Sequence, residues 1–399
     1  MDEFDAIVVG GGPAGASAAI HLALRGARVM LAERERFPRA KLCGEFISPE
    51  CVAHFARLGV GERMSLAGAQ TVARTVFYTR AGRGVDVPSE WFGVAGERRA
   101  LGLSRARMDN ALLTRAREVG VEVVEGATAS AVVEDGGVRG VRLQVDGKEH
   151  LCRARVTLDA TGRARTLARR VVQGRRGKEL KRAPLVAFKA HLEGARGEAG
   201  ACEIYFYEGG YGGLSPVEEG LSNLCFIVRA SDARAHASDA GRLMTEVLMR
   251  NARARESLAG ARVASAWLGV ALDSFGRGET TPTTGLLTVG DAASFIDPFT
   301  GSGMLMALES GELAAETIAR WGEGESFASL ARVYASLYEE RFGARLRLCG
   351  LLRRAAFAPR AASELAVCVL GMSAGLRRTI ARATRGRSAA AGARESTEA

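Results

Sequence analysis

The feature that most constrains this chain is a pair of glycine-rich segments that lie almost 300 residues apart. The first, residues 7–15, carries glycines at the spacing G-x-G-x-x-G after an apolar run. The second, residues 287–304, contains a Gly-Asp pair and then a Gly-Ser-Gly turn. Each segment predicts a strand, a turn and a helix. In this arrangement the free backbone N–H groups at the helix N-terminus bind anions. A chain with both segments is expected to hold the two ends of one extended ligand.

The first segment has the physical properties of a dinucleotide cradle. Residues 4–9 predict a buried parallel strand, and a helix is expected over residues 13–25. In such a turn Gly10 permits the sharp bend, Gly12 lets the backbone approach a pyrophosphate, and Gly15 lets the helix pack on the strand.

A carboxylate follows at the distance that a dinucleotide site requires. Residues 27–32 predict a second strand, which ends at Glu33. A carboxylate there can accept hydrogen bonds from the hydroxyls of an unphosphorylated ribose, which favours FAD or NAD over NADP. The predicted contacts of this half are Gly10, Gly12, Pro13, Ala14, Gly15, Glu33, Arg34 and Ala129.

The second segment predicts a clamp for the other half of the dinucleotide. Asp291 follows Gly290 at the end of a strand and can bond a ribityl hydroxyl. A helix that begins near Gly301 would direct its N-terminus at the pyrimidine end of a flavin, where reduced flavin carries negative charge. The predicted contacts are Gly290, Asp291, Pro298, Gly301, Ser302, Gly303 and Met304.

The rest of the chain predicts an α/β fold with an inserted sheet. Strand-like segments dominate residues 183–275, with glycine-rich turns between them, whereas residues 276–325 return to the strand-and-helix pattern. We therefore expect a Rossmann-like FAD-binding domain (GR2-type) over 1–182, with part of the substrate-site wall at 65–100, an antiparallel substrate-binding sheet at 183–275, a return segment at 276–325, C-terminal helices at 326–385 and a disordered tail at 386–399.

Charge and cysteine content exclude some classes of partner and compartment. The net charge of +10 is concentrated between residues 341 and 388, where eleven arginines accompany one acid, Glu364. No aromatic-studded basic module accompanies them, so nucleic acid is not an expected partner. Seven cysteines without a C-x-x-C pair, and an acidic N-terminus without a signal peptide, favour the cytoplasm.

The arginine-rich C-terminal part leaves two interpretations open. Apolar residues follow helical spacing over 365–380, and arginines flank them. Such a helix can lie on an anionic membrane surface. The alternative, which we prefer, is a helix that packs on the substrate domain with a solvated basic face.

In combination, these motifs resemble the p-hydroxybenzoate-hydroxylase-like flavoproteins. The resemblance is carried by the 10–15 turn, Arg105-x-x-Met108-Asp109, the Asp159-Ala160-Thr161-Gly162 run and the 290–303 clamp. It implies FAD, an inserted substrate sheet, Arg105 near the ribityl or phosphate portion, and a cofactor role for Asp159. Lys41-x-Cys43-Gly44-Glu45 is most similar to the geranylgeranyl-reductase branch, which implies that Cys43 and Gly44 lie near the flavin ring. Cys43 is then the candidate catalytic residue, although a small buried cysteine is the more common interpretation.

Two enzymatic functions and one non-enzymatic function remain open. We favour a single-component monooxygenase that hydroxylates a hydrophobic or aromatic small molecule through a flavin C4a-hydroperoxide. The alternatives are a flavin ene-reductase for prenyl double bonds, and a redox-sensing or electron-transfer flavoprotein. Halogenation is not expected, because the Gly-Trp-x-Trp-x-Ile-Pro signature is absent and no lysine occurs between Lys41 and Lys148. NAD(P)H or a reduced electron-carrier protein is the expected transient donor, since no second nucleotide motif follows a strand.

Tyrosines and histidines complete the candidate residues. Tyr205, Tyr207 and Tyr211 are candidate walls of an aromatic-tolerant pocket, although alternating tyrosines are more often ordinary sheet surface. The five histidines show no ligand spacing, so no metal site is expected.

Overall fold

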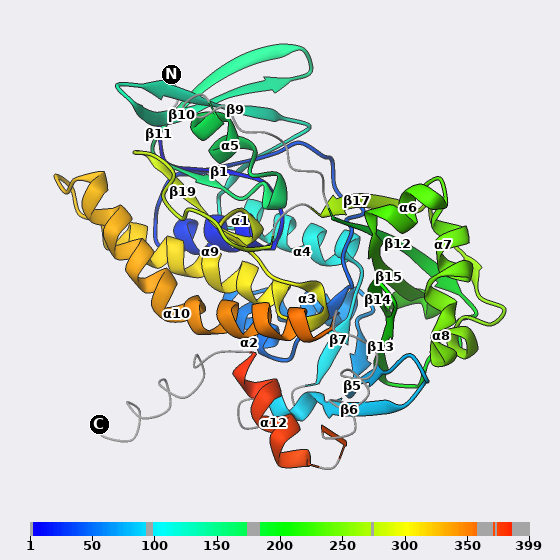
Figure 1. Ribbon diagram of the computed structural model, residues 1–399. Helices are drawn as coiled ribbons and strands as arrows, with labels where there is room; N and C mark the ends of the chain where they lie inside the picture. The colour runs from blue at the N-terminus through cyan, green and yellow to red at the C-terminus, as the bar shows by residue number, and fades with distance from the viewer. Residues whose placement is uncertain are drawn as a thin grey trace.

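Two β-sheets organise the molecule, and a layer of helices packs against each of them. In the computed structural model, residues 3–92, 99–173, 184–272, 275–356, 370–371 and 373–384 are described. Figure 1 shows the first sheet and its helices at the upper left and the second sheet at the right. The predicted α/β fold with an inserted antiparallel sheet and C-terminal helices is confirmed.

The first sheet gathers strands that lie up to about 280 residues apart in the chain. Its order is β8-β2-β1-β11-β10-β9, and β19 pairs in parallel with β11. The strands are β1 (Glu3–Val9), β2 (Val29–Glu33), β8 (Glu122–Glu125), β9 (Thr128–Glu134), β10 (Gly137–Val145), β11 (Lys148–Asp159) and β19 (Leu286–Thr288). Because β1, β2 and β19 are parallel members of one sheet, the turns that follow them emerge at the same edge.

Helices cover one face of the parallel strands of this sheet. The antiparallel strands β9–β11, called the meander below, pack with one helix against the other face. Ala6 and Val8 of β1 pack toward the helical face, whereas Ile7 and Val9 pack toward the meander. The helices are α1 (Pro13–Ala23), α2 (Glu50–Leu58), α3 (Gly61–Leu66), α4 (Arg105–Glu118), α9 (Gly303–Ala319) and α10 (Phe327–Ala356), with α5 (Thr166–Gln173) on the meander side. This two-sided burial explains why β1 is almost wholly apolar.

The second sheet contains the inserted segment together with an earlier hairpin. Its order is β16-β12-β15-β14-β13-β5-β6, with β17 pairing to β12. The strands are β5 (Arg74–Tyr78), β6 (Gly84–Pro88), β12 (Leu185–Glu193), β13 (Ala201–Tyr207), β14 (Gly210–Pro216), β15 (Ser222–Arg229), β16 (Arg262–Val263) and β17 (Leu268–Leu272). Helices α6 (Ala230–Ala235), α7 (Ala240–Glu246) and α8 (Ala252–Ser257) pack on its outer face (Figure 1).

Shorter elements connect these layers. A small sheet joins β3 (Phe46–Ile47), β7 (Ala100–Gly102) and β4 (Gln70–Val72), and β18 (Gly276–Arg277) pairs with β20 (Ser294–Phe295). The 3-10 turns η1 (Ser89–Phe92) and η6 (Pro298–Thr300) and helix α12 (Ala374–Ala383) lie beside the second sheet.

One sequence-based element assignment changes, and another extends beyond the described residues. The glycine-rich run at 209–216, which we predicted as a turn region, is mostly strand β14, because its small residues let neighbouring strands and helices approach closely: a Cβ on Gly210 would lie 1.9 Å from the Ile227 carbonyl oxygen. Of the predicted C-terminal helices at 326–385, α10 and α12 are observed, while residues 357–369, 372 and 385 and the predicted tail at 386–399 lie outside the described residues. No helix within the described ranges is long and apolar enough to cross a membrane.

Candidate flavin site and adjoining cavity

The turn after β1 tolerates only glycine at two positions. Gly10 has a φ of +113°, and a Cβ there would lie 2.4 Å from the carbonyl oxygen of Ala160. A Cβ on Gly15 would lie 1.9 Å from the carbonyl oxygen of Gly10. These contacts press α1 against β1 and the strand beside it, so the predicted roles of these two glycines in the turn follow from the geometry.

Gly12 differs from Gly10 and Gly15, because a Cβ there would meet no backbone atom and would point into a space bordered by two guanidinium groups. The nearest atoms to a Cβ at Gly12 would be Nη2 of Arg105 at 3.7 Å and Nη2 of Arg39 at 4.0 Å. Gly12 is also the N-cap of α1, Pro13 follows it, and no side chain caps the helix. Free backbone N–H groups, a helix dipole and two guanidinium groups therefore meet where a pyrophosphate would bind.

Acidic side chains hold these guanidinium groups in place. Arg105 donates two hydrogen bonds to the buried Asp109, at 2.8 and 2.7 Å, and Arg39 donates to the same carboxylate at 2.9 Å. Lys41 lies in the same field: burial lowers its pKa, and the charges of Arg39 and Arg105 lower it further. Arg39 and Lys41 were not among the predicted contacts: Arg39 stands in no recognisable motif, and from the motif that begins at Lys41 only Cys43 and Gly44 were assigned to the flavin.

Glu33 lies at the end of β2, where the ribose would bind. Its carboxylate accepts hydrogen bonds from the backbone N–H of Gly11 at 2.7 Å and of Glu35 at 3.0 Å. This fixes the carboxylate beside the turn and leaves it able to accept further bonds from hydroxyl groups. Arg34 is exposed and pairs with Glu35, and Ala129 is buried in β9 near this end of the sheet.

The second predicted segment packs directly on the first. A Cβ on Gly290 would lie 2.7 Å from the Cβ of Ala14, and one on Gly311 would lie 2.3 Å from the Ala14 carbonyl oxygen. Ser17 of α1 donates a hydrogen bond of 2.8 Å to the carbonyl oxygen of Leu308. Helices α1 and α9 are therefore in close contact, and one edge of the sheet carries both predicted halves of the site.

Asp291 presents a carboxylate to this edge. Among the described residues, its carboxylate has no hydrogen-bond partner of its own. Burial raises its pKa, and the charges of Arg163, Arg105 and Lys41 oppose that rise. A partly buried acceptor of this kind fits the hydroxyl groups of a ribityl chain.

The N-terminus of α9 is the second uncapped helix end at the site. Gly301 has a φ of +64°, and the helix begins at Gly303. Ser302 is the N-cap, but its hydroxyl bonds to the Thr300 hydroxyl at 3.0 Å and does not cap the helix. Pro298 begins the turn η6 that precedes it, and Met304 is buried in the first turn of α9. The end of α9 thus offers backbone N–H groups and a positive dipole to the pyrimidine end of a flavin.

Asp159, for which the resemblance implied a cofactor role, makes several hydrogen bonds within the chain. Its buried carboxylate accepts hydrogen bonds from the backbone N–H groups of Thr161, Leu167 and Ala168 and from the Thr161 hydroxyl. The side chain therefore closes the turn after β11 and caps α5. This turn places Ala160 against Gly10, so Asp159 supports the turn on which the flavin site is built. A direct contact between Asp159 and the cofactor stays a prediction.

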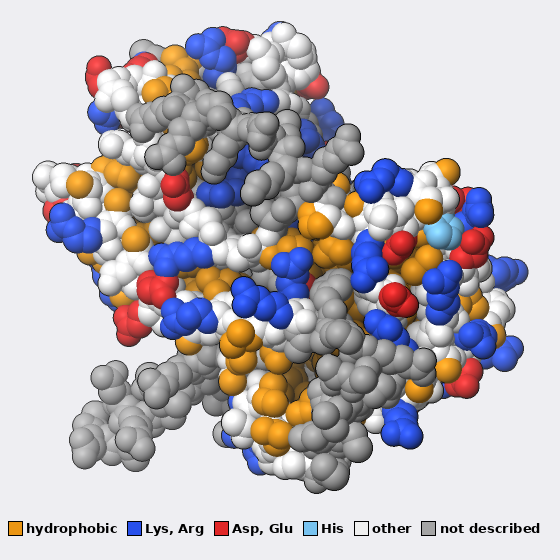
Figure 2. Space-filling model, viewed as in Figure 1, with side chains coloured by type: hydrophobic (Ala, Val, Ile, Leu, Met, Phe, Trp, Pro, Cys, Tyr) orange, Lys and Arg blue, Asp and Glu red, His pale blue; other side chains and the backbone are white. Residues whose placement is uncertain are grey.

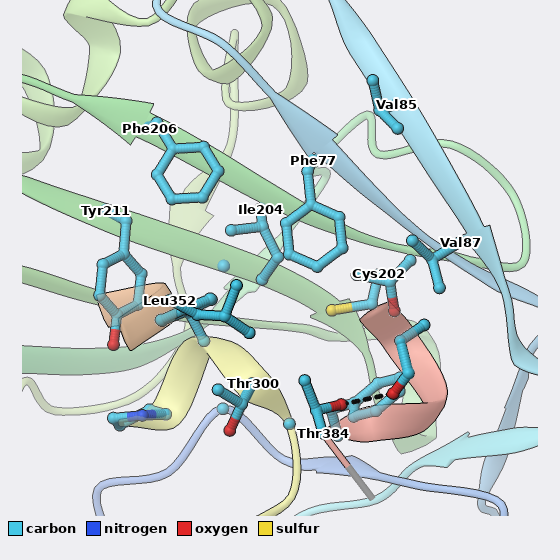
Figure 3. A pocket seen from close by; sticks show the side chains of 18 of the residues that line it. Phe77, Val85, Val87, Cys202, Ile204, Phe206, Tyr211, Thr300, Leu352 and Thr384 are labelled. Atoms are coloured by element: carbon cyan, nitrogen blue, oxygen red, sulfur yellow. Dashed lines mark hydrogen bonds between the residues drawn. The ribbon is translucent and has the colours of Figure 1, made fainter. Parts of the chain in front are cut away.

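An apolar cavity of about 280 Å³ lies between the second sheet and the flavin-site loops. Its floor crosses five strands, and the segment 298–301, helix α12 and the end of α10 form its other walls. Figure 3 shows Tyr211 and Thr300 at one side and Val85 and Val87 at the other. The described lining residues are Gly44, Phe46, Thr75, Phe77, Thr79, Val85, Val87, Phe92, Cys202, Ile204, Phe206, Tyr211, Gly213, Cys225, Ile227, Pro298, Phe299, Thr300, Gly301, Leu352, Leu370, Arg377, Ile380, Ala381 and Thr384.

Of the three candidate pocket tyrosines, only Tyr211 lines this cavity. Its ring packs edge-on against Phe299, with centroids 5.6 Å apart, and its hydroxyl bonds to Asp297. Tyr205 and Tyr207 belong to the core on the opposite face of β13, where α6–α8 cover them, so their prediction as pocket residues is wrong. Cys202, Ile204 and Phe206 of β13 line the cavity instead. Successive side chains of a strand point to opposite faces, so the sequence separates these residues from the tyrosines. It does not show which of the two faces binds the ligand.

Cys43 and Gly44 lie in a loop that joins the two layers. Gly44 and Cys225 line the cavity, and Asn223 donates a hydrogen bond of 3.0 Å to the Cys43 carbonyl oxygen. Cys43 also receives a hydrogen bond from the backbone N–H of Glu45 at 3.4 Å on its sulfur. The loop is thus placed between the flavin-site edge and the cavity, and the catalytic role of Cys43 stays a prediction.

A buried ionic cluster fixes this loop to the second sheet. Glu45 is fully buried with a φ of +54°, and its carboxylate bonds to Lys189, to His191 at 2.6 Å and to the backbone N–H of Arg105 at 2.8 Å. Burial raises the pKa of Glu45, but the hydrogen bond from His191 and the charge of Lys189 lower it overall. The sequence could not reveal this cluster, since its members are about 145 residues apart.

Within the described ranges no group of three or more His, Cys, Asp or Glu side chains is arranged to hold a metal ion.

The fold and the uncapped N-termini of α1 and α9 define a dinucleotide-binding flavoprotein. Its site is completed by two segments that lie almost 300 residues apart in the chain. Residues 3–340 match the FAD binding domain family. The chain belongs to this family, and the predicted resemblance to p-hydroxybenzoate-hydroxylase-like flavoproteins is confirmed. It is therefore an FAD-dependent oxidoreductase by family.

Curated relatives and solved structures resemble most of the chain. It is 30% identical to digeranylgeranylglycerophospholipid reductase 2 of Methanopyrus kandleri, over 86% of this chain and 83% of that protein. It is 29% identical to the menaquinone reductase of Mycobacterium tuberculosis, over 86% and 81% of the two chains. The fold matches a geranylgeranyl bacteriochlorophyll reductase-like protein from Thermoplasma acidophilum, with a TM-score of 0.80, 21% identity and coverage of 96% and 97%. It also matches a flavin-dependent brominase, with a TM-score of 0.78, 21% identity and coverage of 96% and 94%.

Proposed function

We propose that this protein is an FAD-dependent reductase that saturates carbon–carbon double bonds in a long, apolar, prenyl-type chain. The observation that carries the proposal is the shape and lining of the cavity. Its floor runs from β15 to β6 across four strand spacings, about 19 Å. An elongated apolar cavity of this length suits a flexible chain better than a single aromatic ring.

The surroundings of the cavity support this reaction class. Pro298, Thr300 and Gly301 belong to the cavity wall and also precede α9, so a chain in the cavity would reach the flavin-site edge. The two relatives above are named as reductases, one of a digeranylgeranylglycerophospholipid and one of menaquinone, which supports a reductase. Bound reduced FAD would supply the hydride. The apolar walls would hold the chain and exclude water from it.

The monooxygenase that the sequence favoured is the second candidate. Tyr211 and Phe299 provide aromatic surface at the flavin side of the cavity, which would also suit an aromatic ring. The electron donor, NAD(P)H or a reduced carrier protein, remains a proposal in both cases, as does cytoplasmic location.

One experiment separates the two candidates. The FAD-loaded protein is reduced with dithionite without oxygen and is mixed with geranylgeraniol, while flavin absorbance and product mass are followed. A reductase reoxidises its flavin anaerobically and yields a product with two more hydrogen atoms. A product that appears only after oxygen is admitted, with one more oxygen atom, would contradict the reductase and establish the monooxygenase.

A further inference from the structure

One charged side chain interrupts the apolar lining of the cavity. Arg377 of α12 is the only charged residue among the described residues that line it. Its side chain is 16% exposed, and among the described residues its buried Nε has no hydrogen-bond partner. A guanidinium group in such surroundings retains donors that a ligand can satisfy.

The partners that Arg377 does have leave its charge poorly compensated. Within the described part of the chain, the carboxylate paired with Arg377 is that of Asp86 of β6, whose oxygen lies 3.8 Å away, beyond hydrogen-bonding distance. Asp86 is itself 49% exposed, so water screens its charge. The guanidinium also lies 5.9 Å from the centroid of the Trp91 ring, a contact that orients it without accepting its N–H groups.

The position of Arg377 relative to the sheet gives the cavity two different ends. Arg377 contacts β6 and η1 through Asp86 and Trp91, so it stands at the outer edge of the second sheet. Gly301 and Cys225 stand at the other end, beside the flavin-site loops. A ligand that fills the cavity would therefore place its apolar part toward the flavin and its terminal group at Arg377.

We infer that the substrate is an amphiphile with a phosphate-type anionic end, and that Arg377 recognises this end. The inference rests on the proposed function, because it names the kind of chain-bearing molecule that the cavity takes. Arginine pairs with phosphate oxygens through two parallel N–H groups, which would satisfy donors that Asp86 leaves free. Arg377 is thus a specificity-determining residue, and no bond is made or broken at it.

The neighbouring arginine provides a matched control. Arg378 is exposed on α12 and is not a lining residue, so Arg378→Gln removes the same charge from the same helix outside the cavity. The experiment measures the affinity of FAD-loaded protein for geranylgeranyl monophosphate and for geranylgeraniol, by calorimetry or by the fluorescence of tryptophan. Inorganic phosphate alone and phosphatidic acid vesicles are added as separate arms, to distinguish a free phosphate or a lipid surface from a chain-linked phosphate.

We expect Arg377→Gln to weaken binding of the monophosphate by roughly tenfold to a hundredfold, the loss typical of a hydrogen bond to a charged group. Binding of the alcohol should stay within twofold, and Arg378→Gln should change neither. Asp86→Asn should strengthen monophosphate binding, by roughly twofold to fivefold, because it removes the competing carboxylate.

The opposing outcomes are distinct. Equal weakening of both ligands by Arg377→Gln, with no effect of Asp86→Asn, would make Arg377 a structural part of the wall and overturn the inference. An unchanged affinity for the monophosphate, or equal losses in the Arg377 and Arg378 variants, would overturn it as well. If wild-type protein binds neither chain-bearing ligand, the proposed function fails too. If only inorganic phosphate or only vesicles bind, the inferred ligand and the proposed function both fail. If the alcohol binds and the monophosphate does not, the inferred ligand is wrong while a prenyl substrate without a phosphate stays open.

Discussion

At the scale of single residues, neighbouring glycines of one motif have different functions. Gly10 is fixed by a positive φ and by the Ala160 carbonyl oxygen, whereas Gly12 borders open space and two guanidinium groups. Glycine at position 10 is thus a requirement of the fold, and glycine at position 12 is a requirement of the ligand.

This difference predicts opposite behaviour for two alanine substitutions. Gly10→Ala should lower the free energy of unfolding by about 3 kcal/mol, since the new methyl group meets backbone in a strained conformation. Gly12→Ala should leave stability nearly unchanged but weaken FAD binding by about tenfold, since its methyl group enters the phosphate space. Denaturant unfolding of apoprotein and fluorescence titration with FAD measure the two effects; loss of stability in Gly12→Ala would contradict the assignment.

A buried histidine predicts a pH dependence of stability. His21 of α1 is 4% exposed and lies 3.7 Å from Glu312 of α9. Burial lowers the pKa of His21 from 6.5 to about 4, and the charge of Glu312 only partly offsets this.

The unfolded chain therefore binds a proton between pH 6.5 and pH 4 that the folded protein does not. The contribution of this group is complete above pH 6.5 and is lost as the pH falls toward 4, by about 3 kcal/mol in total. His21→Gln should flatten the pH dependence of the unfolding free energy in that window. His236→Gln, at a less buried position on α6–α7, is the control, and equal slopes for wild type and His21→Gln would refute the prediction.

At the scale of elements, strand β13 separates structural from ligand-binding residues by its alternation. Ile204 faces the cavity, and Tyr205 faces the core under α6–α8. Ile204→Trp should fill part of the cavity and weaken binding of geranylgeraniol at least tenfold, while FAD content is retained. Tyr205→Phe should leave that affinity unchanged and lower only stability, because it removes the hydroxyl bonded to Glu203. The reverse result would reassign the two faces.

The elements of the flavin site were the most predictable part of the chain. Strand β1, helix α1 and Glu33 follow from local pattern, because glycine spacing and apolar runs act over a few residues. The cavity was less predictable, since it depends on which face of β13 meets the loops and on where α12 lies. Alternation in a strand defines two faces, but tertiary packing decides which one is the binding face.

The C-terminal helix illustrates the same limit. The sequence favoured a helix packed on the substrate domain, and α12 contributes Arg377, Ile380, Ala381 and Thr384 to the cavity wall. Figure 2 shows hydrophobic side chains gathered on the exposed surface of α12, and Leu376 there is 40% exposed. Contact with a membrane surface therefore stays a prediction, which liposome co-sedimentation of the full chain and of a chain lacking residues 370–399 would test.

At the scale of the whole molecule, the Glu45–Lys189–His191 cluster joins the two layers. Lys189→Met should lower the free energy of unfolding by about 3–5 kcal/mol, because the buried carboxylate of Glu45 loses a charged partner. Glu45→Gln combined with Lys189→Met should recover part of that loss. Denaturant unfolding of the two single variants and the double variant tests the coupling; strictly additive effects would show that the pair does not act together.

The split architecture also has a consequence for how the protein is made. Strand β1 and its glycine turn leave the ribosome before β19 and α9, which follow some 280 residues later, a delay of roughly 15 to 60 seconds at ordinary rates of synthesis. During that interval the nascent chain exposes half of a cofactor site with apolar surfaces that its final neighbours have yet to cover. We therefore expect FAD to be captured only after residues 286–319 have been synthesised, so that cellular FAD supply acts on a chain that already contains both halves of the site.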